Sequence, residues 1–546
     1  MTVSRRDALR ALGLLSASSA VPVAGCGSDP EEPSVEEDDL PRYSHDGSPG
    51  PAALFSHAVA SGDPLSDGVI LWTRVSPEAP GPVEVWWEIG VDRAFRQRVQ
   101  VGTVTTDEQR DYTVKIDVRA LEPGKTYYYR FFALGRGSVA GRTRTAPVGD
   151  VQRLRFGVVS CSSLAHGYFH SYRNLARRLD LDAVLHLGDY IYEYGNAAYG
   201  GVRQYEPAHE IVTLEDYRTR YAQYRRDADL QEVHRQHPFI AVWDDHESAN
   251  DSYKDGAENH QPSTEGAWDA RKDAAIRAYH EWMPIRDGED GRIWRKLSYG
   301  DLVDLVMLDT RLWGRDKQLE GTVLGGPVVS DPERTLLGLD QEAWLAEQLD
   351  ASTAKWKLIG QQVMMAHLKT TGAPNSEGGG MVVNYDQWNG YDSSRSRFFD
   401  LLEQGKIDNV IVLTGDIHSS WAFDLTRDPN NPSAYDPATG MGSLAVEFVT
   451  PAVTSPGLPP LLASALSGLF SQNPHMRFAE ATLRGYIVLD LTPKRAQAAW
   501  YHFDDVVEPK NAKETFAVAF STEDGRNTLL EDAAAAKAPQ GPPAAP

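Results

Sequence analysis

The chain has 546 residues, of which 41% are hydrophobic, so it is long enough for two domains with sizeable cores and flexible ends. Its 54 basic and 77 acidic residues give a formal net charge of −23, which argues against a nucleic-acid backbone or an anionic membrane surface as partner. After the N-terminal region no apolar run approaches the roughly 18 residues of a membrane-spanning helix, so we expect no transmembrane segment there.

The N-terminal region predicts an export signal. Arg5 and Arg6 precede a moderately apolar stretch, residues 11–24, and this arrangement resembles a twin-arginine signal, which exports proteins in folded form. Val23-Ala24-Gly25-Cys26 resembles a lipoprotein cleavage site whose cysteine is acylated. The alternatives are a Sec signal with an incidental arginine pair and a chance run of small residues.

We therefore expect residues 1–26 to be a twin-arginine signal with a lipobox and the twin-arginine translocase to be a partner during export. The expected destination is the periplasm or the cell surface. A lipid on Cys26 would be the only attachment to a membrane.

Two segments are predicted to be flexible. Residues 27–51 hold Pro, Glu, Asp, Ser and Gly with hardly an apolar residue, and such a segment cannot bury enough surface to offset its ordering entropy. Residues 532–546 are mostly Ala, Pro and Gly. We expect the first to be a disordered acidic linker and the second a disordered tail.

Residues 52–147 predict a small all-β domain. Short alternating segments are separated by turn clusters such as Ala79-Pro-Gly-Pro82 and Glu122-Pro-Gly-Lys125, which is typical of a β-sandwich. Leu121 to Tyr127 resembles the corner turn of fibronectin type III-like domains. The region has few metal-ligand residue types, so we assign it no catalytic role.

Residues 148–531 alternate buried strands with helical segments, which predicts a layered α/β catalytic domain. Later strands are expected to complete a second sheet. The expected helices are 169–179, 214–234 and 341–349, and the later strands are 444–450, 486–491 and 496–503.

Five apolar strands of this domain end on metal-ligand residue types. Residues 155–160 lead to Cys161, 181–187 to Asp189 and Tyr192, 239–243 to Asp244-Asp245-His246-Glu247, 357–366 to His367, and 410–414 to Asp416 and His418. Because α/β sheets bind ligands at the carboxyl ends of their strands, this repetition favours a multi-ligand metal centre over satisfied core polar groups. With Cys161 in such a centre and Cys26 in a processing site, we predict no disulfide.

One side of the predicted centre has anionic sulfur and phenol donors. The thiolate of Cys161 and the phenolate of Tyr192, beside the imidazole of His418, suit a trivalent transition metal, which points to iron. A carboxylate that bridges two metals about 4 Å apart fixes the spacing needed to neutralise a phosphoryl group and activate a water or hydroxide. Asp189 is the candidate bridge.

The opposite side offers hard oxygen donors. Asp416, Asn250 and, as a further candidate, Asp245 accept calcium or magnesium more readily than zinc. The two sides together predict the hydrolysis of a phosphate ester by a metal-activated hydroxide.

These motifs resemble those of the calcineurin-like metallophosphoesterases, and within them the PhoD-type alkaline phosphatases. Gly188-Asp189-Tyr190-Ile191-Tyr192 matches the Gly-Asp-x-x-Tyr motif of the iron-containing branch. Asp244–Glu247 and Gly415–His418 stand at the Gly-Asn-His-Glu and Gly-His-x-His motifs and depart from them in the PhoD manner. With Cys161, Leu308-Asp-Thr-Arg311, the export signal and the β-sandwich, the resemblance covers almost the whole chain.

The resemblance implies a fold and a set of ligands. The fold would be a four-layer α/β/β/α metallophosphoesterase sandwich preceded by a fibronectin III-like β-sandwich domain. One Fe³⁺ and one or two Ca²⁺ would be bound, the iron by Cys161, Asp189, Tyr192 and His418, and the calcium by Asp189, Asn250 and Asp416. Which of Asp245 and Asn250 is the closer ligand stays open.

Two histidines receive roles from the same resemblance. His246 would contact the phosphate or protonate the leaving group, since the pKa of an imidazole permits either. His367 stands where the wider superfamily has a second-metal histidine, and a role behind the ligands or in the core is an equal alternative.

We therefore expect an exported, monomeric phosphoester hydrolase that acts on small-molecule or polymer phosphoesters. One alternative keeps the centre for diesters of teichoic acid or phospholipid, and the pocket width set by residues 195–204 and 371–391 decides between the two. Another is a catalytically silent surface lipoprotein whose sandwich binds a partner, against which the intact ligand set argues. A redox role for Cys161 is weaker still, because no second cysteine is available to resolve an oxidised thiol.

Overall fold

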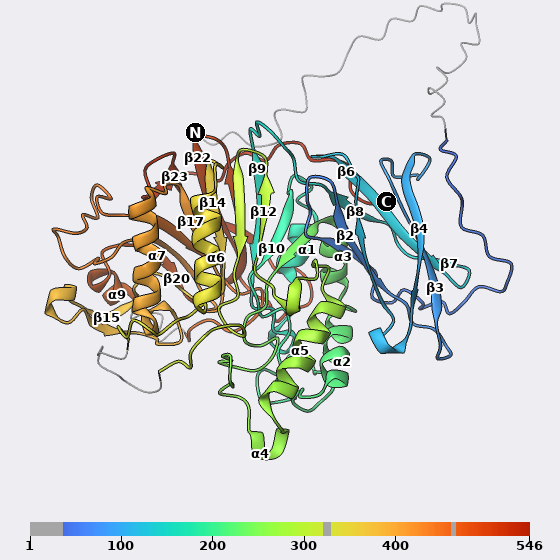
Figure 1. Ribbon diagram of the computed structural model, residues 1–546, viewed down its shortest axis with the longest axis horizontal. Helices are drawn as coiled ribbons and strands as arrows, with labels where there is room; N and C mark the ends of the chain where they lie inside the picture. The colour runs from blue at the N-terminus through green and yellow to red at the C-terminus, as the bar shows by residue number, and fades with distance from the viewer. Residues whose placement is uncertain (1–36, 320–328, 460–465) are drawn as a thin grey trace, which may run out of the picture.

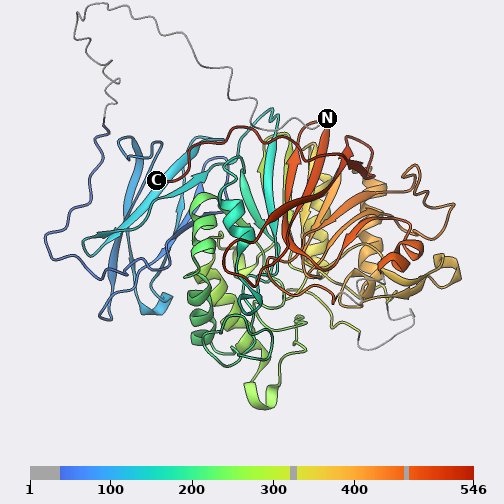
Figure 2. The ribbon, with the colours of Figure 1, turned by 180° about the vertical axis from the view of Figure 1, so that it is seen from behind.

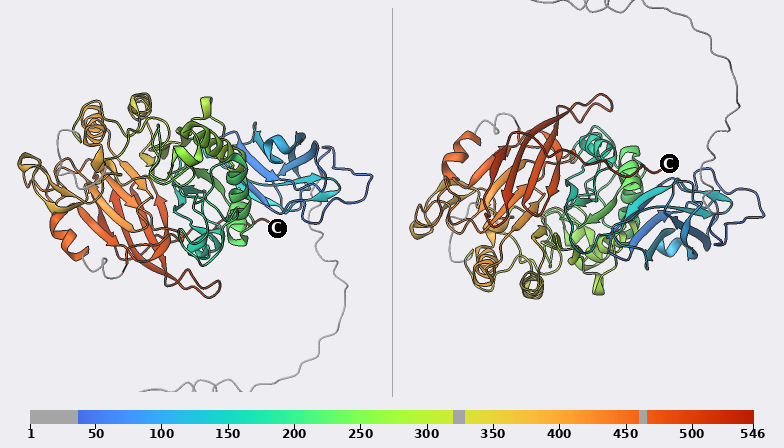
Figure 3. Two further views of the ribbon diagram at one scale, coloured as in Figure 1. Left: turned by 90° about the horizontal axis from the view of Figure 1, so that it is seen from below. Right: turned by 90° about the horizontal axis from the view of Figure 1, so that it is seen from above.

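The computed structural model describes residues 37–319, 329–459 and 466–546. Two stacked sheets with helices on their outer faces form the body, and an all-β unit lies at one end of the long axis, as Figure 1 shows from the front and Figure 3 from below and above. The predicted signal, with Cys26, lies outside the described residues. Within the described part, no helix is long and apolar enough to cross a bilayer.

The first sheet has ten strands and joins segments from all parts of the chain. Its parallel centre brings together the strands that precede Cys161, Asp189 and Asp244. In spatial order the strands are β24 (Leu530–Asp532), β23 (Glu514–Glu523), β22 (Arg495–Phe503), β21 (Arg484–Leu491), β9 (Leu154–Val159), β10 (Ala183–His186), β11 (Pro238–Ala241), β1 (Val59–Gly62), β2 (Val69–Arg74) and β5 (Thr113–Val118).

The second sheet has seven strands, and its parallel centre brings in the strands before Gln361 and Asp416. In spatial order they are β12 (Arg295–Tyr299), β13 (Val303–Met307), β14 (Trp356–Gly360), β17 (Val410–Thr414), β19 (Ala445–Val449), β18 (Ser420–Leu425) and β20 (Met476–Glu480). Of the three late strands expected here, only 444–450 joins this sheet. The other two pair beside β9 in the first sheet, because Ile487 to Leu491 run antiparallel to Val158 to Leu154.

Helices cover the outer faces of both sheets. Apolar side chains of the two sheets meet in one core, and a second core lies between the second sheet and its helices. The order helix, sheet, sheet, helix confirms the predicted four-layer α/β/β/α class. The helices on the first sheet are α1 (His170–Ala176) and α3 (Ala228–Gln236), those on the second are α6 (Leu339–Asp350) and α7 (Asp392–Gly405), and α2 (Leu214–Tyr224), α4 (Pro262–Glu265), α5 (Trp268–Trp282) and α9 (Leu466–Gln472) flank them.

The single helix expected at 214–234 is two helices in the structure. α2 ends at Tyr224, and Asp227 starts α3 by accepting hydrogen bonds from the N–H groups of Asp229 and Leu230 at 3.0 and 3.1 Å. A side chain that satisfies the free N–H groups of a helix start stabilises a new helix at that position.

The N-terminal all-β unit is a sandwich with its own apolar core. One layer is β1, β2 and β5, and the other is formed by β3 (Val83–Gly90), β4 (Arg98–Thr106), β6 (Thr126–Ala133), β7 (Arg136–Gly137) and β8 (Gly141–Arg144). At the corner between two strands, the N–H of Glu122 donates to the phenol oxygen of Tyr127 at 2.9 Å.

This sandwich is continuous with the body of the molecule. β1 pairs in parallel with β11, with Ser61 opposite Pro238 and Gly62 opposite Phe239. The first sheet therefore runs from the sandwich into the body without an open edge beside β11.

The segment before the sandwich is ordered from its first described residue. Asp38 forms an ion pair with Arg98 at 2.5 Å, and the N–H of Gly135 donates to the phenol of Tyr43 at 2.8 Å. The expectation of a disordered linker therefore does not hold for residues 37–51. The physical reason is that a buried guanidinium needs acceptors, and this acidic segment supplies them in place of apolar surface.

The tail was also expected to be disordered, yet it lies along the molecule and reaches the sandwich, as the dark red trace in Figure 2 shows. Its backbone carbonyls accept hydrogen bonds from Arg153 at 2.6 Å, Arg142 at 3.2 Å and Tyr128 at 2.9 Å. Composition misses this interaction because the binding groups are carbonyls of the backbone, and an Ala- and Pro-rich segment offers as many of these as any other.

Deletion of residues 536–546 is expected to lower the thermal stability. The deletion removes acceptors from the buried Arg142 and from Tyr128, and each unsatisfied buried donor costs about 1–3 kcal/mol. We expect the midpoint of thermal unfolding to fall by about 2–5 °C, because the unfolding free energy of a chain of this length changes by about 1 kcal/mol per degree. Lys537→Ala is the matched control and should leave the midpoint unchanged, because the carbonyl at 537 accepts the bond. An unaltered midpoint in the deletion variant would show that the tail contributes nothing.

Candidate metal centre

The site lies where the carboxyl ends of the two parallel sheet centres meet. β9 and β10 of the first sheet end just before Cys161 and Asp189, and β17 of the second sheet ends just before Asp416 and His418. Two cross-links hold the edges together: Thr450 donates to the carbonyl of Val158 at 3.0 Å, and Gln362 donates to that of Trp243 at 2.8 Å.

Backbone strain marks the same positions. Cys161, Asp189, Asp416 and His418 have φ angles of 59°, 57°, 62° and 55°. A non-glycine residue in this left-handed region costs of order 1 kcal/mol or more and persists only where the surrounding structure imposes it. The strained turn after each strand therefore places a potential metal ligand at the edge of the sheet.

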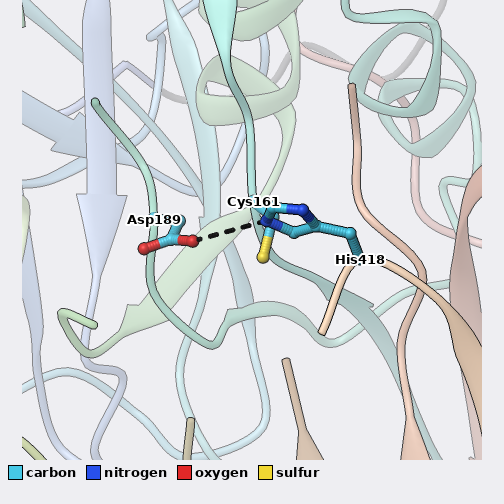
Figure 4. A group of neighbouring side chains, drawn as sticks. All are labelled: Cys161, Asp189 and His418. Atoms are coloured by element: carbon cyan, nitrogen blue, oxygen red, sulfur yellow. Dashed lines mark ion pairs between the residues drawn. The ribbon is translucent and has the colours of Figure 1, made fainter. Parts of the chain in front are cut away.

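The first group of side chains contains a thiol, a carboxylate and an imidazole. Figure 4 shows Cys161, Asp189 and His418 converging from three segments, and their potential ligand atoms all lie within 4.8 Å of one another. The phenol of Tyr192 completes the group, because it donates to Asp189 at 3.0 Å and lies 3.2 Å from Nε2 of His418. All four predicted iron ligands therefore meet in one place.

Two of these four side chains, those of Cys161 and Tyr192, have perturbed acid strengths. Burial and the carboxylate of Asp189 raise the pKa values of both the Cys161 thiol and the Tyr192 phenol well above their ordinary values. A bound cation reverses this effect, since it stabilises the thiolate and the phenolate.

Two further groups extend the site. Asp189, Asp245 and His246 form one, and Asp244, Asp245 and Asp416 form the other, each with potential ligand atoms within 4.8 Å. Asp189 belongs to the first two groups and Asp245 to the last two. Shared carboxylates of this kind are positioned to bridge neighbouring ions, as predicted for Asp189.

A buried arginine that the sequence did not single out as a site residue holds the acidic groups together. Arg311 is fully buried and pairs with Asp244 at 2.5 Å, Asp416 at 2.9 Å and Asp386 at 2.9 Å. The Leu308-Asp-Thr-Arg311 segment directly follows β13, and that position at a strand end was the signal available in the sequence. Nothing comparable pointed to Asp386, which lies in a loop.

The donor set fits bound cations. Oδ1 of Asp189 and Oδ2 of Asp244 are buried with no hydrogen-bond partner in the described part of the chain. Burial raises the pKa values of Asp244 and Asp416, in spite of Arg311, and the other aspartates raise them further. Unpartnered buried oxygens beside an excess of carboxylates are the donors that hard divalent ions take.

His246 is held in a fixed orientation. Its Nδ1 lies 2.7 Å from the carboxylate of Glu193, which is fully buried, and its ring stacks on Tyr192 with centroids 4.2 Å apart. Burial disfavours the charged imidazole, but Glu193 and Asp245 raise the pKa of His246 well above its ordinary value. Sequence reasoning did not find Glu193, because its pairing with His246 depends on how two loops fold.

Asn250 lies beside this pair. Its N–H donates to Glu193 at 2.8 Å, and its side-chain amide donates to Glu258 at 3.1 Å. Asp245, by contrast, is a member of two of the three groups.

His367 does not join the site and lines a separate cavity. β14 ends at Gly360, so the residues that reach the sheet edge are Gln361 and Gln362, and the chain has turned away before His367. The strand expected at residues 357–366 therefore ends at Gly360, and of the two roles left open for His367 the one outside the ligand set fits this position. The hydrophobic pattern extends further than the strand because Val363 to Ala366 are buried although they follow it.

The comparisons with known proteins agree on one family. The model of PhoD-like phosphatases matches residues 156–500, and the model of their N-terminal domain matches residues 43–147. Alkaline phosphatase D of Bacillus subtilis (strain 168) is 37% identical to the chain over 485 residues, which cover 85% of this chain and 80% of that protein. A solved structure described as PhoD matches with a TM-score of 0.81 and 34% identity, over 90% of this chain and 94% of that one.

Removal of bound ions is expected to make the stability fall as pH rises. Burial raises the pKa of Asp416 to about 8 and that of Asp251 to about 7, whereas these carboxyls titrate near 4 in an unfolded chain. The folded, ion-free protein thus holds protons that the unfolded chain releases, and this stabilisation, complete below about pH 4, is lost towards pH 8.

Chelated protein should therefore unfold at a lower temperature at pH 8.5 than at pH 6, and the loss of unfolding free energy should be about 4 kcal/mol. Calorimetry of chelated and ion-loaded samples measures the difference, which should shrink when ions replace the protons. Asp416→Asn should flatten the dependence in the chelated protein. Equal unfolding temperatures of chelated wild-type protein at both pH values would contradict the argument.

Proposed function

The chain belongs to the PhoD-like phosphatase family and is a phosphoric ester hydrolase, and from this premise we propose an exported alkaline phosphatase and phosphodiesterase with an iron and calcium centre. One Fe³⁺ would be held by Cys161, Asp189, Tyr192 and His418. One or two Ca²⁺ would be held by Asp189, Asp245, Asn250 and Asp416. The observation that carries the proposal is the set of three ligand groups joined through Asp189 and Asp245.

The two sides of the centre support different ions. Sulfur, phenol and imidazole donors around Asp189 suit a trivalent transition metal, while the aspartates around Arg311 suit a hard divalent ion that accepts irregular oxygen geometry. When bound, these ions would neutralise the phosphoryl oxygens and supply an activated water.

His246 would act as the proton donor to the leaving oxygen. Its Nδ1 is engaged by Glu193 at 2.7 Å, which leaves Nε2 for the proton transfer, and the imidazole belongs to one ligand group with Asp189 and Asp245. Its contact with the carboxylate of Glu193 favours the protonated imidazolium, and an oriented acid of this kind typically contributes 10²–10⁴-fold to the rate. Glu193 is thus a positioning residue for His246.

Arg311 would orient the carboxylates and would not bind the substrate directly. Its guanidinium is fully buried, and three carboxylates surround it at hydrogen-bonding distance. An arginine with its donors engaged in this way sets the direction of the aspartate oxygens that face the ions.

One segment near the centre bears on the choice between phosphomonoesters and phosphodiesters. The ring of Tyr199 stacks on Tyr192 with centroids 5.5 Å apart and lies near Tyr194 with centroids 4.9 Å apart, so Tyr194 and Tyr199 form an aromatic wall beside the ligand Tyr192. An aromatic wall suits the second organic group of a diester as well as an aryl monoester. We propose that the enzyme hydrolyses both kinds of ester.

The experiment that tests the centre uses Cys161→Ser and Tyr192→Phe. Thiolate and phenolate donation to ferric iron produces a charge-transfer band, so the wild-type protein should be coloured. Cys161→Ser should lose iron and colour, Tyr192→Phe should bleach or shift the band, and turnover should fall by about two to four orders of magnitude. Metal analysis, the absorption spectrum and the hydrolysis of a chromogenic monoester and diester provide the readouts.

Tyr190→Phe is the matched control, because Tyr190 lies in the same segment but its phenol contacts His234 at 2.9 Å. It should keep both the iron and the colour. A colourless wild-type protein that is fully active with stoichiometric zinc would overturn the iron assignment, as would a Cys161→Ser variant with normal iron content and normal rate.

We also propose that the protein leaves the cytoplasm in folded form. The support is the Arg5-Arg6 pair before a moderately apolar stretch and the Cys26 lipobox. Folded export suits a protein whose ions are loaded before translocation, because its ligands come from segments as distant as Cys161 and His418 and meet only after folding.

Replacement of both Arg5 and Arg6 by Lys should leave an active enzyme in the cytoplasm with its signal uncleaved. Fractionation, followed by immunoblotting and phosphatase assay of each fraction, measures the distribution. Arg10→Lys is the control and should be exported normally. Full export of the double variant would rule out the twin-arginine route.

A further inference from the structure

A second polar cavity of about 320 Å³ lies apart from the three ligand groups. We call it the basic cavity, and the residues of its wall that matter here are His367, Lys369, Tyr385, Asn389, Asp392 and Arg395. They come from β15 (Lys369–Gly372), the short helix Trp388–Gly390, α7 and the segments between them. The cavity opens to solvent, but Lys369, Asn389 and Arg395 in its wall are each at least 97% buried, so these polar side chains are held in place by packing.

The wall of the basic cavity carries more hydrogen-bond donors than acceptors. The ammonium of Lys369 has three donors, and it contacts the carbonyl of Ala373 at 3.2 Å and Oδ1 of Asn430 at 3.0 Å. Arg395 donates to Asn389 at 3.0 Å, and the amide nitrogen of Asn389 has no partner among the described residues. A buried amide that lacks an acceptor calls for one in the bound state.

The charges of the wall favour an anion. Among the described residues of the wall, Asp392 is the only acid, and it is partly exposed and paired with Arg395 at 2.7 Å. Burial lowers the pKa of Lys369 to about 8, although Asp428 lies nearby, and burial together with Arg395 and Lys369 lowers the pKa of His367. An anion in the cavity would relieve this cost of desolvated positive charge.

A chain of side-chain contacts links one wall of the basic cavity to the metal centre. Tyr385 forms part of its wall, and the next residue, Asp386, accepts two hydrogen bonds of 2.9 Å from one nitrogen of Arg311. Arg311 in turn contacts Asp416 at 2.9 Å. One arginine therefore separates the cavity segment from the candidate calcium ligands.

We propose that the basic cavity binds a second phosphate group carried by the alcohol portion of the substrate, so that the enzyme prefers bisphosphorylated compounds. Three donors from three different elements surround a space large enough for a tetrahedral oxyanion, which offers oxygens in several directions, whereas a carboxylate offers two in one plane. This inference rests on the phosphoesterase function proposed above.

The test compares two series of substrates on the metal-loaded, full-length enzyme. One series is the α,ω-alkanediol bisphosphates from two to six carbons, and the other is the monophosphates of the same diols. At the chain length that spans the two sites, the bisphosphate should show a kcat/KM about 10- to 100-fold above that of the monophosphate, which is the effect of one or two charge-assisted hydrogen bonds.

Two variants assign this preference to the cavity. Lys369→Met removes a charge, and Asn389→Asp keeps the shape and the contact with Arg395 but adds a negative charge that repels a phosphate. Both should reduce the preference to about one and leave kcat/KM for the monophosphates within about twofold of wild type. Lys355→Met is the control, since Lys355 pairs with Asp524 on the surface, and it should keep the full preference.

The outcomes separate this proposal from the function on which it rests. If neither series is hydrolysed, the phosphoesterase function itself fails. If monophosphates are hydrolysed but no bisphosphate is preferred at any length, or if Asn389→Asp retains the preference, the basic cavity does not bind the substrate. The proposal is equally overturned if Lys369→Met changes only inhibition by free phosphate, because the cavity then takes the free ion.

Discussion

Electrostatic repulsion among buried carboxylates is the constraint on which the rest of this site depends. Asp189, Asp244, Asp245 and Asp416 lie together at the edge of two sheets, and Arg311 is the cation that contacts three of them. One guanidinium cannot balance this charge, and burial makes the imbalance more costly than it would be in water. The arrangement is stable either with protons on the carboxylates or with metal ions between them. The same imbalance that destabilises the ion-free fold thus makes the site bind cations strongly, so folding and ion binding are two aspects of one free-energy balance.

The strands and the ligand side chains that follow them could be predicted from the sequence, because the end of a strand is a local feature. Cys161, Asp189 and His418 each follow an apolar run within a few residues, and a run that ends at a turn predicts where its next polar side chain emerges. The left-handed φ angles at these positions show that the turns are strained and lower the stability of the fold. The sequence alone did not reveal this strain, because a non-glycine residue gives no outward sign that it will adopt such a conformation.

Contacts that join distant segments could not be predicted. Glu193 reaches His246 and Asp386 reaches Arg311 only because two loops fold against each other, and neither pairing has a periodic signal. The order of the C-terminal tail was not predicted for a related reason, since its contacts use backbone carbonyls, which every residue has. The strand before His367 was predicted to be too long. The buried run continues past the end of β14, so the hydrophobic pattern does not show where the strand ends. In each case the missing information lay in three-dimensional packing and not in residue type.

The N-terminal sandwich also takes part in holding the site. β11 leads directly to Asp244, Asp245 and His246, and without β1 it would be the unpaired edge of the first sheet. Edge strands lack half of their ladder hydrogen bonds and are more mobile or prone to pairing with other chains. Pairing of Ser61 and Gly62 with Pro238 and Phe239 removes this edge a few residues before the ligands. The sandwich contributes no residue to the three ligand groups. It can nevertheless affect catalysis, because it determines how rigidly β11 holds Asp245 and His246 at the centre.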